Sequence, residues 1–336
     1  MPRKSGVSCS EKRNTMKKII SLLLALVLLV LPLAACGDGE KETVRLGGMT
    51  GPTSIGMAHL LDEDAKGSSM NDYEFTLASA GDEIKTKLLQ GDLDIAAVPA
   101  NLAAALYNAT EGKIKLLAVN TFGVVSILEK GETVQSVADL AGKKVYAPAT
   151  ARGAIPELVF NYLLSVHGVT DVTVEWIEAT GLAAKLKSEA GAIVLSPEPN
   201  ATAILANVEG SRRALHLGDE WAALDNGAEY VTGVVVARTA FIEENPTAVE
   251  NFLKEYAVSV AYANESTAET ARLTAEFKIL SITEKVIERS IPYANIRYMD
   301  GEEMKTVLKG FIDLVLPGNP KAFGGKAPDD GFYYVK

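Results

Sequence analysis

The sequence predicts an α/β fold made of parallel strand–helix–strand units, and three observations lead to this prediction. From Thr43 onward, short apolar runs typical of buried strands alternate with amphipathic runs typical of helices. Several of the apolar runs end in glycine, proline or hydroxyl residues that can begin a helix. The chain of 336 residues also exceeds one average domain, so two compact α/β regions are expected.

The clearest example of the pattern begins with residues 83–90, whose apolar side chains share one helical face. Gly91 is predicted to end this helix in a left-handed conformation, because it has no Cβ atom. The almost wholly apolar residues 94–98 predict a parallel strand covered on both faces. Pro99 cannot continue the strand but can begin a helix, and Asn101 can cap it. A helix N-terminus is thus expected just beyond the carboxyl end of a strand, where ligands bind in open α/β sheets.

The same pattern predicts the remaining elements. Strands are expected over residues 43–46, 73–77, 114–119, 124–128, 143–146, 172–176, 192–195, 215–217 and 230–237. Helices are expected over residues 55–61, 102–106, 137–142, 158–164, 182–187, 204–205, 245–262, 284–290 and 302–314. The strands 114–119 and 124–128 follow each other without a helix, which indicates a crossing between the two regions, and 230–237 is the expected crossing back.

The N-terminus predicts export. Lys17 and Lys18 precede an apolar run over residues 19–30, which has the length of a signal sequence and is too short for a membrane span. The segment 33–36, Leu-Ala-Ala-Cys, resembles the lipobox of bacterial lipoproteins, in which the cysteine is lipidated and becomes the new N-terminus. We therefore expect a signal peptide over residues 1–35, with Met16 as a second candidate start, and a lipidated tether over 36–42 that anchors the protein through Cys36 to the outer face of a membrane.

Charge and cysteine content exclude several functions. The formal charge is −10, and because the first 35 residues are basic, the remaining chain carries −15. Such an acidic body argues against nucleic-acid binding. The mature protein would retain Cys36 as its single cysteine, so neither a disulfide nor a cysteine-based metal site is expected. No metal site and no cofactor are predicted, and His59 is interpreted as an ordinary helical residue.

The chain resembles the substrate-binding lipoproteins of ABC importers, and most closely those for sulfonates, taurine, nitrate and thiamine pyrimidines. The likeness extends over residues 43–336. The matching motifs lie at 51–53 (Gly-Pro-Thr), 91–96 (Gly-Asp-Leu-Asp-Ile-Ala), 98–103 (Val-Pro-Ala-Asn-Leu-Ala), 139–145 (Asp-Leu-Ala-Gly-Lys-Lys-Val) and 241–246 (Phe-Ile-Glu-Glu-Asn-Pro).

The resemblance implies a type II periplasmic-binding-protein fold, with two doubly wound α/β lobes joined by two crossover strands. Lobe 1 would comprise residues 43–121 and 238–336, and lobe 2 would comprise residues 122–237. A small anionic or nitrogen- or sulfur-containing solute would be held between the lobes by hinge closure. The protein would be a monomer that delivers the solute to a membrane permease driven by a cytoplasmic ATPase. The expected ligand-binding residues are Thr50, Gly51, Pro52, Thr53, Ser54, Ser79, Ala80, Pro99, Ala100, Asn101, Ala149, Thr150, Ala151, Arg152, Ser196, Pro197, Glu198 and Asn200.

The chemistry of these residues leaves the ligand open. Helix N-termini favour a negative group, and Arg152 is the expected cation, although it can equally be a solvated first-turn arginine. Glu198 would suit an amine or an aminopyrimidine, or it can simply stabilise its own helix dipole. Tyr146, Trp176 and Tyr230 could stack on an aromatic ligand or belong to the core.

Two other functions remain as alternatives. Enzymes acting on menaquinone or thiamine precursors use the same scaffold, but the three histidines, His59, His167 and His216, lie outside the expected binding loops, and no nucleophile stands beside an evident base. An extracellular solute sensor without transport is the other alternative. We expect a solute-binding protein without catalysis.

Overall fold

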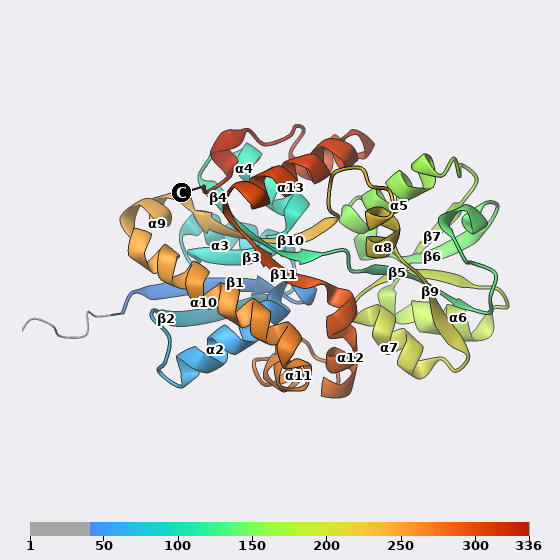
Figure 1. The fold of residues 1–336 in the computed structure, drawn as a ribbon, viewed down its shortest axis with the longest axis horizontal. Coiled ribbons are helices and arrows are strands. Elements are labelled where there is room, and N and C mark those ends of the chain that lie inside the picture. Colours follow the sequence, from blue (N-terminus) through green and yellow to red (C-terminus); the bar gives the residue numbers. More distant parts are fainter. Residues whose placement is uncertain (1–40, 336) are drawn as a thin grey trace, which may run out of the picture. The chain divides into compact units, whose positions relative to one another are not determined.

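The computed structural model describes residues 41–335, so the predicted signal peptide and Cys36 lie outside the described residues. The strands are β1 (Thr43–Met49), β2 (Asp72–Ala78), β3 (Ile95–Pro99), β4 (Ile114–Phe122), β5 (Val125–Lys130), β6 (Lys144–Pro148), β7 (Thr173–Ile177), β8 (Ile193–Pro197), β9 (Ser211–His216), β10 (Val231–Arg238) and β11 (Ile296–Met299). They form a six-stranded sheet of order β11-β4-β10-β3-β1-β2 and a five-stranded sheet of order β7-β6-β8-β5-β9 (Figure 1).

Helices connect and cover these strands. The α-helices are α2 (Ala58–Ala65), α3 (Gly81–Gln90), α4 (Ala100–Thr110), α5 (Ile155–Val166), α6 (Leu182–Ser188), α7 (Asn200–Asn207), α8 (Leu217–Ala222), α9 (Thr239–Glu244), α10 (Pro246–Glu265), α11 (Thr267–Glu276), α12 (Glu284–Ala294) and α13 (Gly301–Val315). The 3₁₀ turns used below are η1 (Pro52–Met57) and η3 (Ala149–Ala151).

The six-stranded sheet lies between two layers of helices. One buried cluster joins the sheet to α3, α4 and α13, and another joins its opposite face to α2, α10, α11 and α12. Figure 1 shows α4 and α13 above this sheet and α2, α10 and α11 below it. The strands β1, β2 and β3 are parallel, as β6, β7 and β8 are in the other sheet, and both sheets also contain antiparallel pairs.

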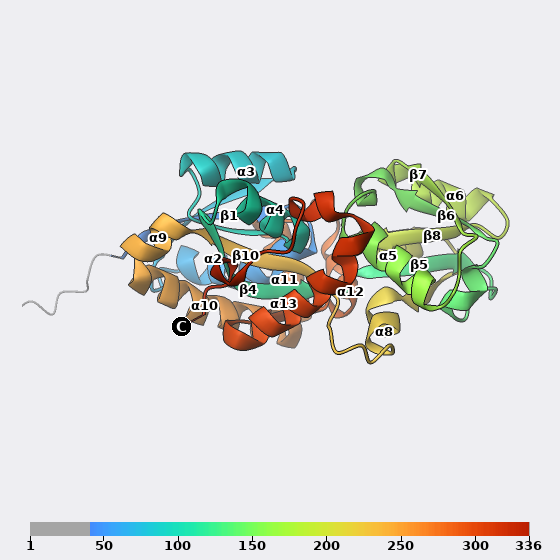
Figure 2. The same cartoon turned by 90° about the horizontal axis from the view of Figure 1, so that it is seen from above.

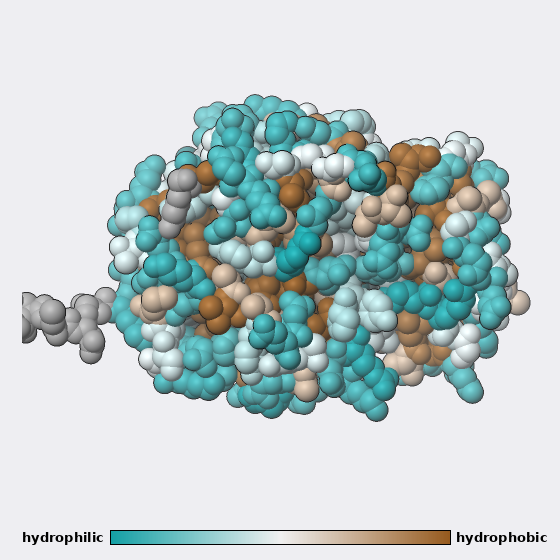
Figure 3. Space-filling view, in the orientation of Figure 1, coloured by the Kyte–Doolittle hydropathy of each residue, from teal (hydrophilic) through white to brown (hydrophobic). Residues whose placement is uncertain are grey.

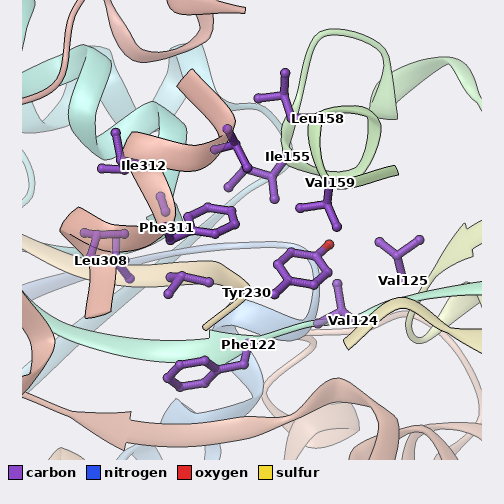
Figure 4. Packing of buried hydrophobic residues seen from close by; sticks show 14 of the residues in the cluster. Phe122, Val124, Val125, Ile155, Leu158, Val159, Tyr230, Leu308, Phe311 and Ile312 are labelled. Atoms are coloured by element: carbon purple, nitrogen blue, oxygen red, sulfur yellow. The ribbon is translucent and has the colours of Figure 1, made fainter. Parts of the chain in front are cut away.

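The chain passes between the two sheets through β4 to β5 and through α8 to β10. An apolar core continues across this junction, because Leu158 and Val159 of α5 belong to the same buried cluster as Tyr230, Phe311 and the strand residues around them (Figure 4). Burial of such side chains is the dominant favourable term in folding. The assignment of residues 43–121 and 238–336 to one lobe and 122–237 to the other stays a prediction.

Two polar contacts reinforce this junction. The side chain of Asn319 donates a hydrogen bond to the carbonyl of Gly153 at 3.2 Å, where the C-terminal segment after α13 reaches α5 (Figure 2). At the other side, Asn295 donates to the carbonyl of Gly123 in the first crossing. The two sheets are therefore connected by packing and hydrogen bonds as well as by the chain itself.

A buried ion cluster holds the amino end of β3. The carboxylate of Asp94 accepts hydrogen bonds from the backbone and guanidinium of Arg45 and from the guanidinium of Arg238, at 2.6–3.0 Å. Asp94 is only 1% exposed. Because Arg45 lies on β1 and Arg238 ends β10, the cluster ties three neighbouring strands together.

Most local predictions are confirmed, one strand is misplaced and one was missed. Helix α3 ends at Gly91 with φ of 81°, and α4 begins directly after β3, as predicted. The strand predicted over 215–217 instead covers Ser211–His216, and Leu217 begins α8. Strand β11 was not predicted, because its four residues carry too short a pattern to distinguish a strand from a loop.

The surface is largely polar. The face seen in Figure 3 is covered mostly by hydrophilic residues, with smaller apolar patches among them. None of the helices formed by residues 41–335 combines the length and apolar character needed to span a bilayer.

Candidate functional site

The candidate site consists of the loops that follow the parallel strands. Strands β1, β2 and β3 of one sheet and β6 and β8 of the other each end in one of the predicted segments. Carboxyl ends of parallel strands meet at one edge of a sheet, and this edge is where α/β proteins bind ligands. The topology therefore gathers the predicted residues into one group at each sheet.

The first segment, Thr50 to Ser54, is held closely by its own sheet. The hydroxyl of Ser54 donates to the carbonyl of Met49 at 2.7 Å, and the carbonyl of Thr53 accepts from the side chain of Asn120 at 2.8 Å. Both Thr53 and Ser54 are buried, so the hydroxyls that were predicted to face a ligand are partly used internally. Thr50 is exposed, and Gly51 and Pro52 are half-buried.

A glycine on β10 allows η1 to approach the sheet. A Cβ atom at Gly233 would stand 2.4 Å from Cγ2 of Thr53 and 2.7 Å from Oδ1 of Asn120. Gly233 also pairs with Pro99 at the end of β3. Two predicted site residues, Thr53 and Pro99, therefore both lie next to Gly233.

The segment after β2 is exposed. Ser79 and Ala80 are both open to solvent, and the backbone amide of Thr50 donates to the carbonyl of Ala78 at 3.0 Å, which places them beside the first segment. Helix α3 follows with Asp82 and Glu83 in its first turn. These carboxylates already offset the positive end of the helix dipole.

The segment after β3 begins α4 as predicted, but Asn101 is not its cap. The helix starts at Ala100 and has no side-chain cap, while the Asn101 amide points toward the carbonyl of Ala322 at 3.5 Å. A residue inside the first turn cannot adopt the extended backbone of a cap, which corrects the prediction. No acidic residue stands in this first turn, so its free amides remain available to a negative group.

Arg152 lies ahead of a helix rather than in its first turn. Residues Ala149–Ala151 form η3, and α5 begins only at Ile155. Ala149, Thr150 and Arg152 are exposed while Ala151 is buried, and among residues 41–335 no carboxylate pairs with the Arg152 side chain. The carboxylate of Glu157 accepts from the amide of Gly153. The α5 N-terminus therefore carries its own anion, whereas Arg152 is a cation without a partner in the described chain.

Glu198, in the segment after β8, is occupied by internal contacts. Its Oε2 accepts from the amide of Thr202 at 3.1 Å, which stabilises the start of α7. Its Oε1 lies 2.7 Å from Nη2 of Arg213, a contact between charges, since this oxygen accepts no aligned hydrogen bond within residues 41–335. Glu198 is 2% exposed, Ser196 is buried, and Pro197 and Asn200 are half-buried.

Arg213 is the cation that the sequence reasoning missed. It lies on β9, donates to the hydroxyl of Ser126, and stacks over the ring of Tyr293 with its guanidinium carbon 3.7 Å from the ring centre. Tyr293 belongs to α12 beside the six-stranded sheet, and Figure 1 shows α12 next to α7. Arg213 therefore connects the segment of Glu198 with an element packed on the other sheet.

The aromatic candidates belong mainly to the core. Tyr146 is fully buried, with its hydroxyl 2.6 Å from a carboxylate oxygen of Glu189, and Tyr230 is 3% exposed among Trp221 and Phe311. Trp176 is half-buried. Hollows of about 420, 480 and 320 Å³ lie in the described chain, and Tyr230 lines the second of them. None of the residues of the predicted binding loops lines any of the three.

Comparisons with known proteins agree with this architecture. The described chain has the type II periplasmic-binding-protein fold: a protein from Parabacteroides distasonis described as an ABC transporter superposes with a TM-score of 0.72 at 22% identity over 88% of this chain and 100% of its own. The aliphatic sulphonate binding protein SsuA of Escherichia coli gives 0.68 at 16% identity over 87% and 92%. The nitrate-binding protein NrtA of Synechocystis gives 0.57 at 17% identity over 84% of both chains.

A comparison of the sequence with protein-family models matches the central part of the chain. Residues 113–270 match the family model described as NMT1/THI5 like. No curated protein matches the sequence. The resemblance predicted from the motifs is thus confirmed at the level of the fold and of this central segment.

Proposed function

We propose that the protein is the extracytoplasmic solute-binding component of an ABC importer and has no catalytic activity. The observation that carries the proposal is the agreement in fold along nearly the whole described chain with proteins described as ABC transporter, sulphonate-binding and nitrate-binding. The proposed partners are a small solute, a membrane permease and its cytoplasmic ATPase, and the protein acts as a monomer.

The solute binds between the two groups of loops. The lobes are residues 43–121 with 238–336, and residues 122–237, and they close over the solute by bending at the two crossings between the sheets. The binding residues are those predicted after β1, β2, β3, β6 and β8. The exposure of Thr50, Ser79, Ala80, Thr150 and Arg152 supports this assignment, because these groups remain available.

The charges of the loops indicate where a negative group of the solute would bind. Helices α3, α5 and α7 each have a carboxylate at their N-terminus, so their dipoles are already offset. Helix α4 has none, and Arg152 has no partner in the described chain. A carboxylate, sulfonate or similar group is therefore expected at the start of α4 and near Arg152, and the remainder of the solute contacts the neutral residues.

A thermal-shift screen tests the proposal. The panel contains taurine, alkanesulfonates, nitrate, aminopyrimidines, flavins and purines. A ligand at a hundred times its dissociation constant stabilises by about 2.7 kcal/mol, which raises the Tm of a chain of this size by several degrees. A response to anions supports the assignment of α4 and Arg152, and a response to aminopyrimidines alone moves the site toward Glu198. If no compound of the panel raises the Tm and the protein converts a menaquinone or thiamine precursor, the proposed solute-binding function is wrong and the protein is an enzyme.

Arg152→Ala tests the cation directly. Removal of a charged hydrogen bond should weaken an anionic ligand by about 1.5–3 kcal/mol. Lys144→Ala is the matched control, because this lysine lies in the same lobe but pairs with Glu175 and Glu189. Equal affinity of Arg152→Ala and wild type would remove Arg152 from the site.

Export and anchoring rest on the leader, which lies outside the described residues. We propose that Cys36 is lipidated and holds the protein on the outer face of the membrane. Cys36→Ala should then release the protein from the membrane fraction, whereas Cys9→Ala, in a segment removed with the leader, should not. Retention of the Cys36→Ala variant in the membrane would contradict lipidation.

A further inference from the structure

Helix α2 carries three potential metal ligands within one turn. The ligand atoms of His59, Asp62 and Glu63 all lie within 4.8 Å of one another, and this is the one group of three such residues found within residues 41–335. All three side chains are half-buried. Their spacing of i, i+3 and i+4 places them on one side of the helix.

The His59 ring is held in place and has an unpartnered nitrogen. Its ring stacks on Tyr262 of α10, with the ring centres 3.9 Å apart and the planes at 11°. Its Nδ1 is buried and has no hydrogen-bond partner in the described chain. A buried nitrogen without a partner is uncommon in folded proteins and calls for an explanation. A metal ion bound to this nitrogen would supply the missing partner while the stacked ring stays in place.

The two carboxylates already hold a positive charge between them. Nζ of Lys66 lies 2.7 Å from Asp62 and 3.0 Å from Glu63. The Lys66 side chain is 55% exposed, and surface ion pairs of this kind contribute little to stability. Lys66 can therefore withdraw into solvent and leave both carboxylates to another cation.

The surroundings leave room to complete a coordination shell. A hollow of about 320 Å³ is lined by His59 and Glu63 together with Ser68, Met70, Glu255 and the cationic Lys254. Zinc bound by three protein ligands takes water as a fourth in a tetrahedral shell. Bond lengths of about 2.0–2.2 Å place the ligand atoms of a tetrahedral shell roughly 3.4 Å apart. The ligand atoms of the three side chains lie within 4.8 Å of one another, so they must move closer together by side-chain rotation to bind the ion.

We propose that His59, Asp62 and Glu63 bind a divalent cation of the zinc class, at a site separate from the proposed solute site. One imidazole with two carboxylates suits zinc better than magnesium or calcium, which prefer oxygen ligands only. This inference departs from the sequence-based expectations that His59 is an ordinary helical residue and that the chain holds no metal.

Titration calorimetry with zinc chloride tests the site. The protein is purified in detergent without a polyhistidine tag, and any free thiol is alkylated so that no cysteine can bind metal. The expected result is one zinc ion per chain and an increase in Tm when zinc is added. An absence of zinc binding by the wild-type chain would overturn the proposal.

Matched variants separate the ligands from the fold. His59→Phe keeps a ring against Tyr262 but has no nitrogen, and Glu63→Gln keeps the shape of the side chain, so each should weaken zinc by at least about tenfold. His167→Phe and Glu303→Gln change exposed residues of the same types elsewhere and should leave the affinity unchanged. Wild-type affinity in His59→Phe would disprove ligation by the imidazole.

Lys66→Ala provides a test in the opposite direction. Removing the competing ammonium should tighten zinc binding roughly three- to fivefold, as expected for two weak surface pairs. Lys309→Ala is the control, because Lys309 pairs with Asp313 at the same 2.7 Å on α13. Weaker zinc binding in Lys66→Ala would show that the cation does not replace the lysine, which contradicts the site as proposed.

Discussion

Two buried carboxylates, Asp94 and Glu198, lie at opposite ends of parallel strands and are held differently. Asp94 stands at the amino end of β3 and is 1% exposed, and Glu198 follows the carboxyl end of β8 and is 2% exposed. Asp94 has two arginine partners, whereas Glu198 has Arg213 alone. The same chemistry thus occurs far from the proposed solute site and within it.

The difference lies in how completely each carboxylate is satisfied. Both oxygens of Asp94 accept hydrogen bonds, and together they join three neighbouring strands. Only one oxygen of Glu198 accepts a hydrogen bond within the described chain, and the other has a charge contact. The amino end of the strands is therefore fixed for stability, while the carboxyl end keeps a polar group that is not fully used, which is typical of a binding region.

Asp94→Asn should have the largest effect on stability. It leaves the two arginines without their counter-charge, which for a buried pair costs about 3–5 kcal/mol. The lower end is expected, because the Arg45 side chain is 40% exposed and can regain water. Urea unfolding of the variant gives the free energy, and Asp313→Asn, an exposed partner of Lys309, serves as the control. If Asp94→Asn and Asp313→Asn lower the free energy of unfolding equally, Asp94 contributes no more to stability than an exposed carboxylate.

Glu198→Gln should have a smaller effect. Arg213 loses its charged partner, and the start of α7 loses a charged acceptor, which together cost about 1.5–3 kcal/mol. The amide still accepts from Thr202 through its carbonyl oxygen, so part of the helix start survives. If Glu198→Gln lowers the free energy of unfolding as much as Asp94→Asn does, the two carboxylates contribute equally to stability. The proposed difference between the amino end of β3 and the carboxyl end of β8 would then be wrong.

Local patterns in the sequence predicted much of the fold. The helix ending at Gly91, the strand up to Pro99 and the helix after it depend on residues within about twenty positions of one another, and the structure confirms them. Asp94 within an otherwise apolar run was itself a signal of a buried charge that needs partners. Its partners are 49 and 144 positions away, so no local pattern could identify them.

The candidate site was predicted less completely for the same reason. The loops follow from strand–helix boundaries, but which side chains are occupied depends on strand order and register. Arg213 reaches Ser126 across β5 and β9, a pair with an irregular register, and it meets Tyr293 from a helix 80 positions later. The predicted strand 215–217 began two residues too late to include Arg213. The role of the predicted residues in solute binding stays a prediction.

Acid should reduce the contribution of Asp94 to stability. Burial by itself would raise the pKa of Asp94, but the hydrogen bonds from Arg45 and Arg238 hold it below its ordinary value of 3.8. The stabilisation is therefore complete above about pH 4 and is lost as the pH falls toward the lower pKa of the folded state, by at most about 1.4 kcal/mol per pH unit. The difference in unfolding free energy between wild type and Asp94→Asn should thus shrink below pH 4, and a difference that stays constant would contradict the charge mechanism.

The contact of Arg213 with Tyr293 should give the smallest effect, because the tyrosine is 42% exposed and a cation–π contact at such a site contributes about 0.5–1 kcal/mol. A double-mutant cycle of Tyr293→Ala and Arg213→Met, measured by urea unfolding, isolates this coupling from the separate loss of the Glu198 pair. Val258→Ala on α10 removes an even more exposed side chain without touching Arg213 and is the control. A positive coupling would make Arg213 a connection between the Glu198 segment and α12, so that a solute displacing one contact would loosen the other. A coupling of zero would leave the junction between the two sheets to the apolar core around Tyr230 and Phe311, and the polar network of Glu198 would then act within one sheet alone.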